Sequence, residues 1–228
     1  MSIVRRLFSE ALGSAFLLAT VVGSGIMAER LAGGNAALAL LANALATGAG
    51  LLAFILMFGP VSGAHFNPVV TLSQAWLKHM PAGEALPYIL VQIGGAFAGL
   101  AAAHTMFQEP VFFASEHIRT GAAQWWSEFV ATFGLIAVII STSRSRPAVT
   151  PFAVAAYITA AYWFTASTSF ANPALTLARA ASNTFAGIRP LDVGGFIVAQ
   201  SGGAALSTLL FNWLYPPQKS VAVAEKAG

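Results

Sequence analysis

Two asparagines, each followed by a proline, are the residues of this sequence best suited to bind a small molecule. Asn67-Pro68-Val69 lies in the first half of the chain and Asn172-Pro173-Ala174 in the second. Asparagine is a preferred N-cap and proline suits the first helical position, so each motif predicts the start of a short helix. If the asparagine oxygen caps that helix, the amide N–H₂ group is left to donate hydrogen bonds to an uncharged solute.

The sequence has few residues that are suited to catalysis or to metal binding. The 228 residues include no cysteine, which excludes thiolate nucleophiles and thiolate metal sites. The four histidines, at positions 65, 79, 104 and 117, do not have the spacing of metal ligands. The net charge of +3 is small and the basic residues are spread out, which argues against nucleic acid as a partner. We predict that the protein is not an enzyme and needs no metal or cofactor.

The composition indicates a membrane protein. Hydrophobic residues make up 57% of the chain and charged residues 8%, whereas soluble domains carry about 25% charged residues. A helix that crosses a bilayer needs about 20 apolar residues. We expect six such spans, at roughly 7–29, 36–58, 82–105, 122–142, 148–168 and 190–214. Two apolar pieces that follow the Asn-Pro motifs, at about 67–77 and 172–182, are too short to cross.

The two halves of the chain repeat the same features in the same order. Glu10 and Glu128 open the first and fourth spans, the Asn-Pro motifs follow, and Gln92 and Gln200 each precede a Gly-Gly pair. Each half has three spans, an odd number, so the second half must be inverted. Inverted repeats, here at about 5–108 and 122–215, put a substrate path at their interface. The two short helices then meet at their N-termini, and their positive dipole ends face one spot.

The backbone before each asparagine must be non-helical. At membrane depth such backbone is tolerated only when it is buried in protein or lines water. We expect Glu10 and Glu128 to accept hydrogen bonds from its N–H groups; a role as proton-relay acids is the alternative, because charge within a span often marks function. His65, two residues before the first asparagine, is expected beside the path, with a packing role as the alternative.

The motifs resemble those of the aquaporin and aquaglyceroporin family of major intrinsic proteins. The resemblance covers about residues 5–215 and is strongest over Ser62–Leu72, where only Val69 departs from the family's Asn-Pro-Ala. It implies an all-α integral membrane fold, with six transmembrane helices and two re-entrant half-helices forming one channel domain over residues 1–228. It also implies a central pore in each protomer, a homotetramer, and partners limited to the bilayer, water and small uncharged solutes.

The family's selectivity filter is where this sequence departs. Alignment to the motifs puts the four filter positions at Thr47, Ala160, Ser169 and Leu175. Water-selective relatives have an aromatic residue, a histidine and an arginine there, and the arginine position is Leu175 in this chain. Pore selectivity depends on diameter, lining donors and electrostatic barriers, so we predict a wide filter.

The expected function is therefore a passive channel for water and small uncharged solutes such as glycerol-like polyols. Resemblance to bacterial members that lack the arginine adds arsenite or methylated arsenicals as solutes. The alternatives are a water-selective aquaporin, a coupled secondary transporter, and a structural membrane protein that uses the fold for adhesion.

Arg179 complicates the filter. It lies four residues after Leu175, on the same face of the short helix and one turn, roughly 5–6 Å, further outward. One interpretation makes it a vestibule charge that partly replaces the missing arginine. The interpretation that we favour is an outer-surface cation, solvated or paired with Asp192.

Basic residues favour an orientation with both termini in the cytoplasm. The resemblance to bacterial members implies that the membrane is the inner membrane of a bacterium. The residues then inside are Arg5, Arg6, Lys78, Arg144, Arg146, Lys219 and Lys226, and those outside are Arg30, Arg119, Arg179 and Arg189. The first apolar run also fits a cleavable signal peptide, but the repeat requires it as an integral span. The tail over residues 216–228 is expected to be disordered and cytoplasmic.

Overall fold

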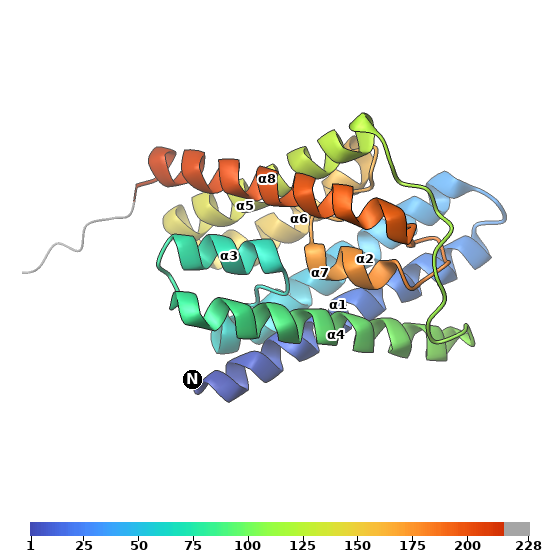
Figure 1. Ribbon diagram of the computed structural model, residues 1–228, viewed down its shortest axis with the longest axis horizontal. Coiled ribbons are helices and arrows are strands. Elements are labelled where there is room, and N and C mark those ends of the chain that lie inside the picture. The colour runs from blue at the N-terminus through green and yellow to red at the C-terminus, as the bar shows by residue number, and fades with distance from the viewer. Residues whose placement is uncertain (217–228) are drawn as a thin grey trace, which may run out of the picture.

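The computed structural model describes residues 1–216, which fold into helices joined by turns and loops, with no strand among them (Figure 1). The long helices are α1 (Ile3–Leu31), α2 (Ala36–Ser62), α4 (Ala85–Phe107), α5 (Ala122–Ser145), α6 (Thr150–Phe164) and α8 (Val193–Leu214). The short ones are α3 (Pro68–Trp76) and α7 (Pro173–Arg179). Single 3₁₀ turns precede α4, α6 and α8, at Ala82–Glu84, Pro147–Val149 and Pro190–Asp192. The predicted disordered tail lies, apart from Pro216, outside the described residues.

The helices of each half pack on one another, and the halves then pack together. In the first half α1 contacts α2 and α4, in the second α5 contacts α6 and α8, and α2 contacts α6 across the halves. The short helices α3 and α7 lie end to end in the middle of the molecule (Figure 1). The N-terminus and the last turn of α8 lie at the same end, as an even number of crossings requires (Figure 1).

Five of the helices in residues 1–216 are long and apolar enough to cross a membrane, and α6 is shorter. It has 15 residues and ends at Phe164, so the prediction of a fifth span reaching residue 168 is wrong. The Thr165 backbone is extended, and its hydroxyl donates to the carbonyl of Ala161 (2.7 Å). A continuing helix would use that carbonyl as the acceptor for the Thr165 N–H. The threonine hydroxyl therefore competes with the backbone N–H for the same acceptor.

Both short helices begin at their predicted prolines, with Asn67 and Asn172 as N-caps. The backbone before the two caps has the same conformation. The residues one and three positions before each asparagine have left-handed φ angles: Phe66 50°, Ala64 52°, Ala171 48° and Ser169 51°. Each such residue costs of order 1–3 kcal/mol unless the surroundings hold it. The shared conformation supports the inverted repeat, and it requires strong contacts to both loops.

Glycines allow close helix contact at equivalent places in the two halves. A Cβ atom at Gly95 on α4 would overlap the backbone of Ala11 on α1. A Cβ atom at Gly203 on α8 would overlap the backbone of Phe129 on α5. Ala11 and Phe129 each follow the glutamate that opens their half, so close packing brings each glutamate up to its loop. Small residues at helix contacts of this kind are typical of membrane proteins.

The close packing predicts different effects for neighbouring glycines. Gly95→Ala should lower stability by about 1–3 kcal/mol, because the added methyl meets backbone that cannot move aside. Gly94→Ala is the matched control, since no atom lies within 4 Å of a Cβ there and alanine favours helix. Thermal unfolding in detergent, followed by tryptophan fluorescence, measures both. Equal melting temperatures for the two variants would contradict the packing argument.

Candidate functional site

The carboxylate of Glu10 satisfies the first non-helical loop. Glu10 on α1 is completely buried, and its two oxygens accept hydrogen bonds from the backbone N–H groups of His65 (2.9 Å) and Phe66 (2.7 Å). The side chains of Ser62 (2.6 Å) and Gln92 (2.8 Å) donate to the same carboxylate. Backbone donors that no helix could satisfy at this depth therefore have a buried partner.

Glu128 makes the equivalent contacts in the second half. Its oxygens accept from the backbone N–H groups of Phe170 (2.8 Å) and Ala171 (2.8 Å), and from Gln200 Nε2 (2.6 Å). Gln200 also donates to Thr176 Oγ1 on α7 (2.9 Å), which links the glutamate to the short helix. These are the contacts that a loop-bracing carboxylate makes, and they use the oxygens that a proton relay would need.

The two asparagines tie the short helices together. Each side-chain oxygen accepts from the backbone of its own helix's first turn. Asn67 Nδ2 donates to the carbonyl of Ala171 (2.7 Å), and Asn172 Nδ2 donates to the carbonyl of Phe66 (2.8 Å). The expectation that both N–H bonds of each amide face the path is therefore wrong for one of the two. One N–H of each amide joins the two loops, and one is left.

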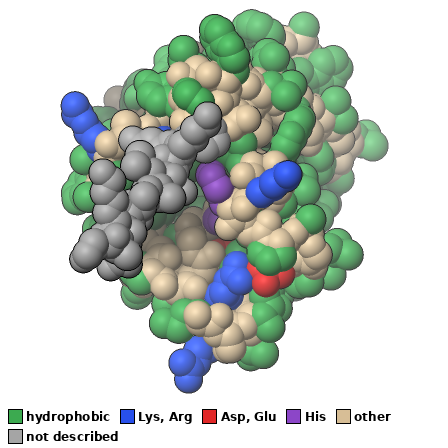
Figure 2. All heavy atoms as spheres, turned by 90° about the vertical axis from the view of Figure 1, so that its left-hand side faces the viewer, with side chains coloured by type: hydrophobic (Ala, Val, Ile, Leu, Met, Phe, Trp, Pro, Cys, Tyr) green, Lys and Arg blue, Asp and Glu red, His purple; other side chains and the backbone are tan. Residues whose placement is uncertain are grey.

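A cavity of about 540 Å³ passes the two capping asparagines, which both line it. Arg6, His79 and Arg144 line the end that lies on the side of the N-terminus, and Ser169 and Arg179 line the opposite end. Figure 2 looks onto the first of these ends and shows a hollow with histidine and basic side chains around it. The cavity therefore reaches from one end of the helix bundle to the other.

The other residues predicted at the midplane do not line this cavity. Val69 and Ala174 are buried, and Pro68 and Pro173 occupy the first positions of α3 and α7. They pack where the short helices meet. His65 does line the cavity, half-buried, with Nδ1 3.1 Å from Thr71 Oγ1.

Three of the four predicted filter residues, Thr47, Ser169 and Leu175, line the cavity together. The fourth, Ala160, is exposed on the outer face of α6, and its assignment is wrong. Tyr162 lines the cavity instead, and its hydroxyl donates to Thr47 Oγ1 (3.2 Å). An aromatic residue that the sequence assignment did not include therefore lines the cavity beside Thr47.

The error at Ala160 has a geometrical cause. The α6 residues on the cavity wall are spaced by four: Thr150, Val154, Ile158 and Tyr162. Two residues along a helix correspond to a rotation of about 200°, so Ala160 lies on the opposite side from both Ile158 and Tyr162. Helix α6 is apolar on every side, and its composition could not indicate the correct face. Every face of a helix has residues spaced by about four, so the sequence held no signal that selected this face.

Arg179 is not a surface cation, and the interpretation that we favoured from the sequence is wrong. Its side chain is 3% exposed and lines the cavity. The guanidinium carbon lies 3.2 Å from the centre of the Phe170 ring, and Nε donates to the carbonyl of Ala186. Asp192 pairs instead with Arg189 (2.8 Å).

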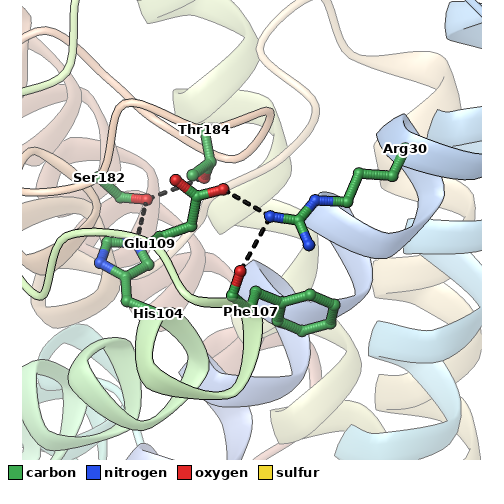
Figure 3. A network of polar contacts seen from close by, with 6 residues as sticks. All are labelled: Arg30, His104, Phe107, Glu109, Ser182 and Thr184. Carbon is green, nitrogen blue, oxygen red and sulfur yellow. Dashed lines mark hydrogen bonds and ion pairs between the residues drawn. The ribbon is translucent and has the colours of Figure 1, made fainter.

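A polar network anchors the loop that follows α7 (Figure 3). The completely buried His104 on α4 contacts Ser182 Oγ through Nε2 (2.8 Å), and Ser182 contacts Thr184 (2.8 Å). Beside it, Arg30 at the end of α1 pairs with Glu109 (2.8 Å). The loop that supplies the carbonyl partner of Arg179 is therefore tied to α4 through His104. The Arg30–Glu109 pair joins the end of α1 to the segment after α4 and does not include that loop.

Residues 1–158 match the family described as Major intrinsic protein. Over 219 residues the chain is 50% identical to "Aquaglyceroporin AqpS" of Rhizobium meliloti (strain 1021), an alignment that covers 96% of this chain and 94% of that protein. The chain belongs to the major intrinsic protein family.

Two further relatives match more than nine tenths of the chain. "Aquaporin Z" of Bradyrhizobium diazoefficiens is 25% identical over 247 residues, covering 98% of this chain and 99% of that protein. The X-ray structure of the aquaglyceroporin from Plasmodium falciparum superimposes with a TM-score of 0.68 at 18% identity, over 92% of this chain and 96% of that one. At this identity the structural match concerns the fold.

These findings confirm the resemblance and the fold class. The chain is an all-α integral membrane protein with the fold of this channel family. Channels of the family pass water and small solutes such as glycerol, and the prediction of a passive channel is confirmed.

The buried glutamates give a second prediction. Glu128→Gln should lower stability by about 1–3 kcal/mol, because one of the two backbone N–H groups then faces an amide donor instead of an acceptor. Glu29→Gln on the exposed face of α1 is the control, since that side chain has no hydrogen bond or ion pair within residues 1–216. Melting temperature in detergent is the readout. Similar shifts for the two variants would argue against the bracing role.

Proposed function

We propose that this protein is a passive channel of a bacterial inner membrane that conducts water and small uncharged solutes, with no chemical step and no cofactor. The observation that carries the proposal is the cavity that runs between the two ends of the bundle past Asn67 and Asn172. Its wall combines neutral polar groups with apolar side chains such as Leu175 and Val70.

The asparagines and short helices act as a neutral-solute site. Each asparagine keeps one amide N–H after joining the loops, and this N–H replaces a hydrogen bond that the solute loses on leaving water. The N-termini of α3 and α7 meet at the same place. Their positive dipole ends raise the energy of a cation there, so they favour uncharged molecules.

The filter, as we propose it, consists of Thr47, Tyr162, Ser169 and Leu175. Leucine in place of the usual arginine removes a long side chain, which supports passage of molecules larger than water. The name of AqpS, an aquaglyceroporin, supports glycerol-like polyols as the solute class. Arsenite and methylated arsenicals remain predictions from the resemblance.

The arrangement in the membrane is also proposed. The N-terminus and the end of α8 lie on one side, and Arg6 and Arg144 line the cavity mouth there, which supports placing both termini in the cytoplasm. The paired contacts of Glu10 and Glu128 support inverted repeats over about 5–108 and 122–215 within a single channel domain. We further propose a homotetramer with one pore in each protomer, in contact with lipid and not with nucleic acid.

Flux through liposomes tests the function. The purified protein, reconstituted into liposomes, should speed stopped-flow scattering changes for water, glycerol and urea relative to empty liposomes. Leu175→Arg should slow glycerol and urea by about tenfold, a factor typical of adding a group to a close-fitting pocket. Leu175→Met is the matched control, because it keeps an apolar side chain of similar volume.

Two results would contradict the proposal. Fast water flux without solute uptake would make the protein a water-selective aquaporin. No flux of either kind above that of empty liposomes would exclude an open channel.

A further inference from the structure

Arg179 is a buried charge without an acidic partner. The ion pairs within residues 1–216 are Arg6–Glu84, Arg30–Glu109 and Arg189–Asp192, and none includes Arg179. Its charge lies instead against the face of the Phe170 ring, at 3.2 Å from the ring centre. A buried charge is costly unless paired, and within a membrane protein it usually lines a functional path.

Donors at this end of the cavity lack partners. Of the Arg179 guanidinium nitrogens, Nε alone has an acceptor among residues 1–216, which leaves the N–H groups of Nη1 and Nη2. The Ser169 hydroxyl is also buried without a partner in this part of the chain. Both residues line the cavity. Since buried polar groups are nearly always hydrogen-bonded, these donors point to a partner that the cavity supplies.

Neighbouring segments hold the guanidinium in place. The Phe170 backbone is fixed by Glu128, and its ring packs edge-on against Phe196 at 5.2 Å. Arg119, from the loop between α4 and α5, lies 5.0 Å from the same ring and donates through Nε to the carbonyl of Gly187 (2.7 Å). The loop that carries the acceptor of Arg179 is anchored through His104 (Figure 3). A long, flexible side chain is thus confined to one position.

Apolar side chains lie beside these donors. Leu175 lies one turn before Arg179 on α7 and lines the same part of the cavity. A solute at this level would find donors on Arg179 and Ser169, and apolar contact with Leu175 and Phe170. This combination suits a small molecule with several oxygen acceptors on a short carbon skeleton.

We propose that Arg179 is the solute-selecting residue of the outer constriction. Its terminal N–H groups donate to the oxygens of neutral polyhydroxylated solutes, and its charge opposes the entry of cations, protons included. The filter has therefore kept its guanidinium and moved its origin by one helical turn. This inference rests on the proposed channel function and names the residue that sets its selectivity.

The test compares two solutes that differ by one hydroxyl. Liposomes with wild-type protein should take up glycerol faster, relative to propane-1,3-diol, than liposomes with Arg179→Met do. We expect the ratio of the two permeabilities to fall about tenfold in the variant, which corresponds to about 1.4 kcal/mol. Proton leak, followed with an internal pH dye under an imposed potential, should rise about tenfold for the same reason.

The controls separate this inference from the proposed function. Arg30→Met removes an arginine from the same end of the molecule, outside the cavity, and should change neither readout. If the wild type conducts nothing above empty liposomes, the channel function fails. If the wild type conducts and Arg179→Met keeps both the solute ratio and the low leak, the role of Arg179 is wrong and the channel function stands.

A second variant covers the case in which Arg179→Met does not fold. Phe170→Leu keeps the arginine and removes the ring that positions it. It should lower the ratio of glycerol to propane-1,3-diol permeability while water flux persists. An unchanged ratio in Phe170→Leu would overturn the proposal.

Discussion

The structure depends on one requirement: non-helical backbone inside a membrane must find hydrogen-bond acceptors within the protein. Two buried carboxylates, Glu10 and Glu128, meet it by each accepting two consecutive backbone N–H groups. These bonds help to hold the left-handed residues before each asparagine, where the chain turns sharply into a short helix. The direction of both short helices, and so the polarity of the site between them, follows from the same contacts.

The close helix packing serves the same requirement. Gly95 lets α4 approach α1 beside Glu10, and Gly203 lets α8 approach α5 beside Glu128. The glutamines one turn earlier on α4 and α8 then reach the carboxylates. Small residues, acids and amides thus form one functional unit that occurs twice. The cavity is the space that remains where the two units meet.

The repeated features of this fold could be predicted from the sequence, and the orientation of apolar helices could not. The half-helix starts and the glutamate contacts follow from capping chemistry and from the recurrence of the motifs. Ala160 was misassigned because α6 is apolar on all sides, so that only its packing decides that Tyr162 faces inward. Arg179 was misjudged because a charged residue at a helix end is usually solvated, and its aromatic partner Phe170 is set by tertiary structure. The end of α6 at Phe164 depended on competition by the Thr165 hydroxyl, which composition does not reveal.

The reciprocal bonds of the asparagines have a consequence for biogenesis. Asn67 donates to the carbonyl of Ala171, which is synthesised 104 residues later. The carbonyl of Phe66 accepts from Asn172, which is synthesised 106 residues later. When the ribosome has released only the first half, those groups have no partner, and the first half-helix has nothing to abut. The first re-entrant segment therefore gains these hydrogen bonds only after the second has been synthesised, so the contacts between the two halves are among the last to form.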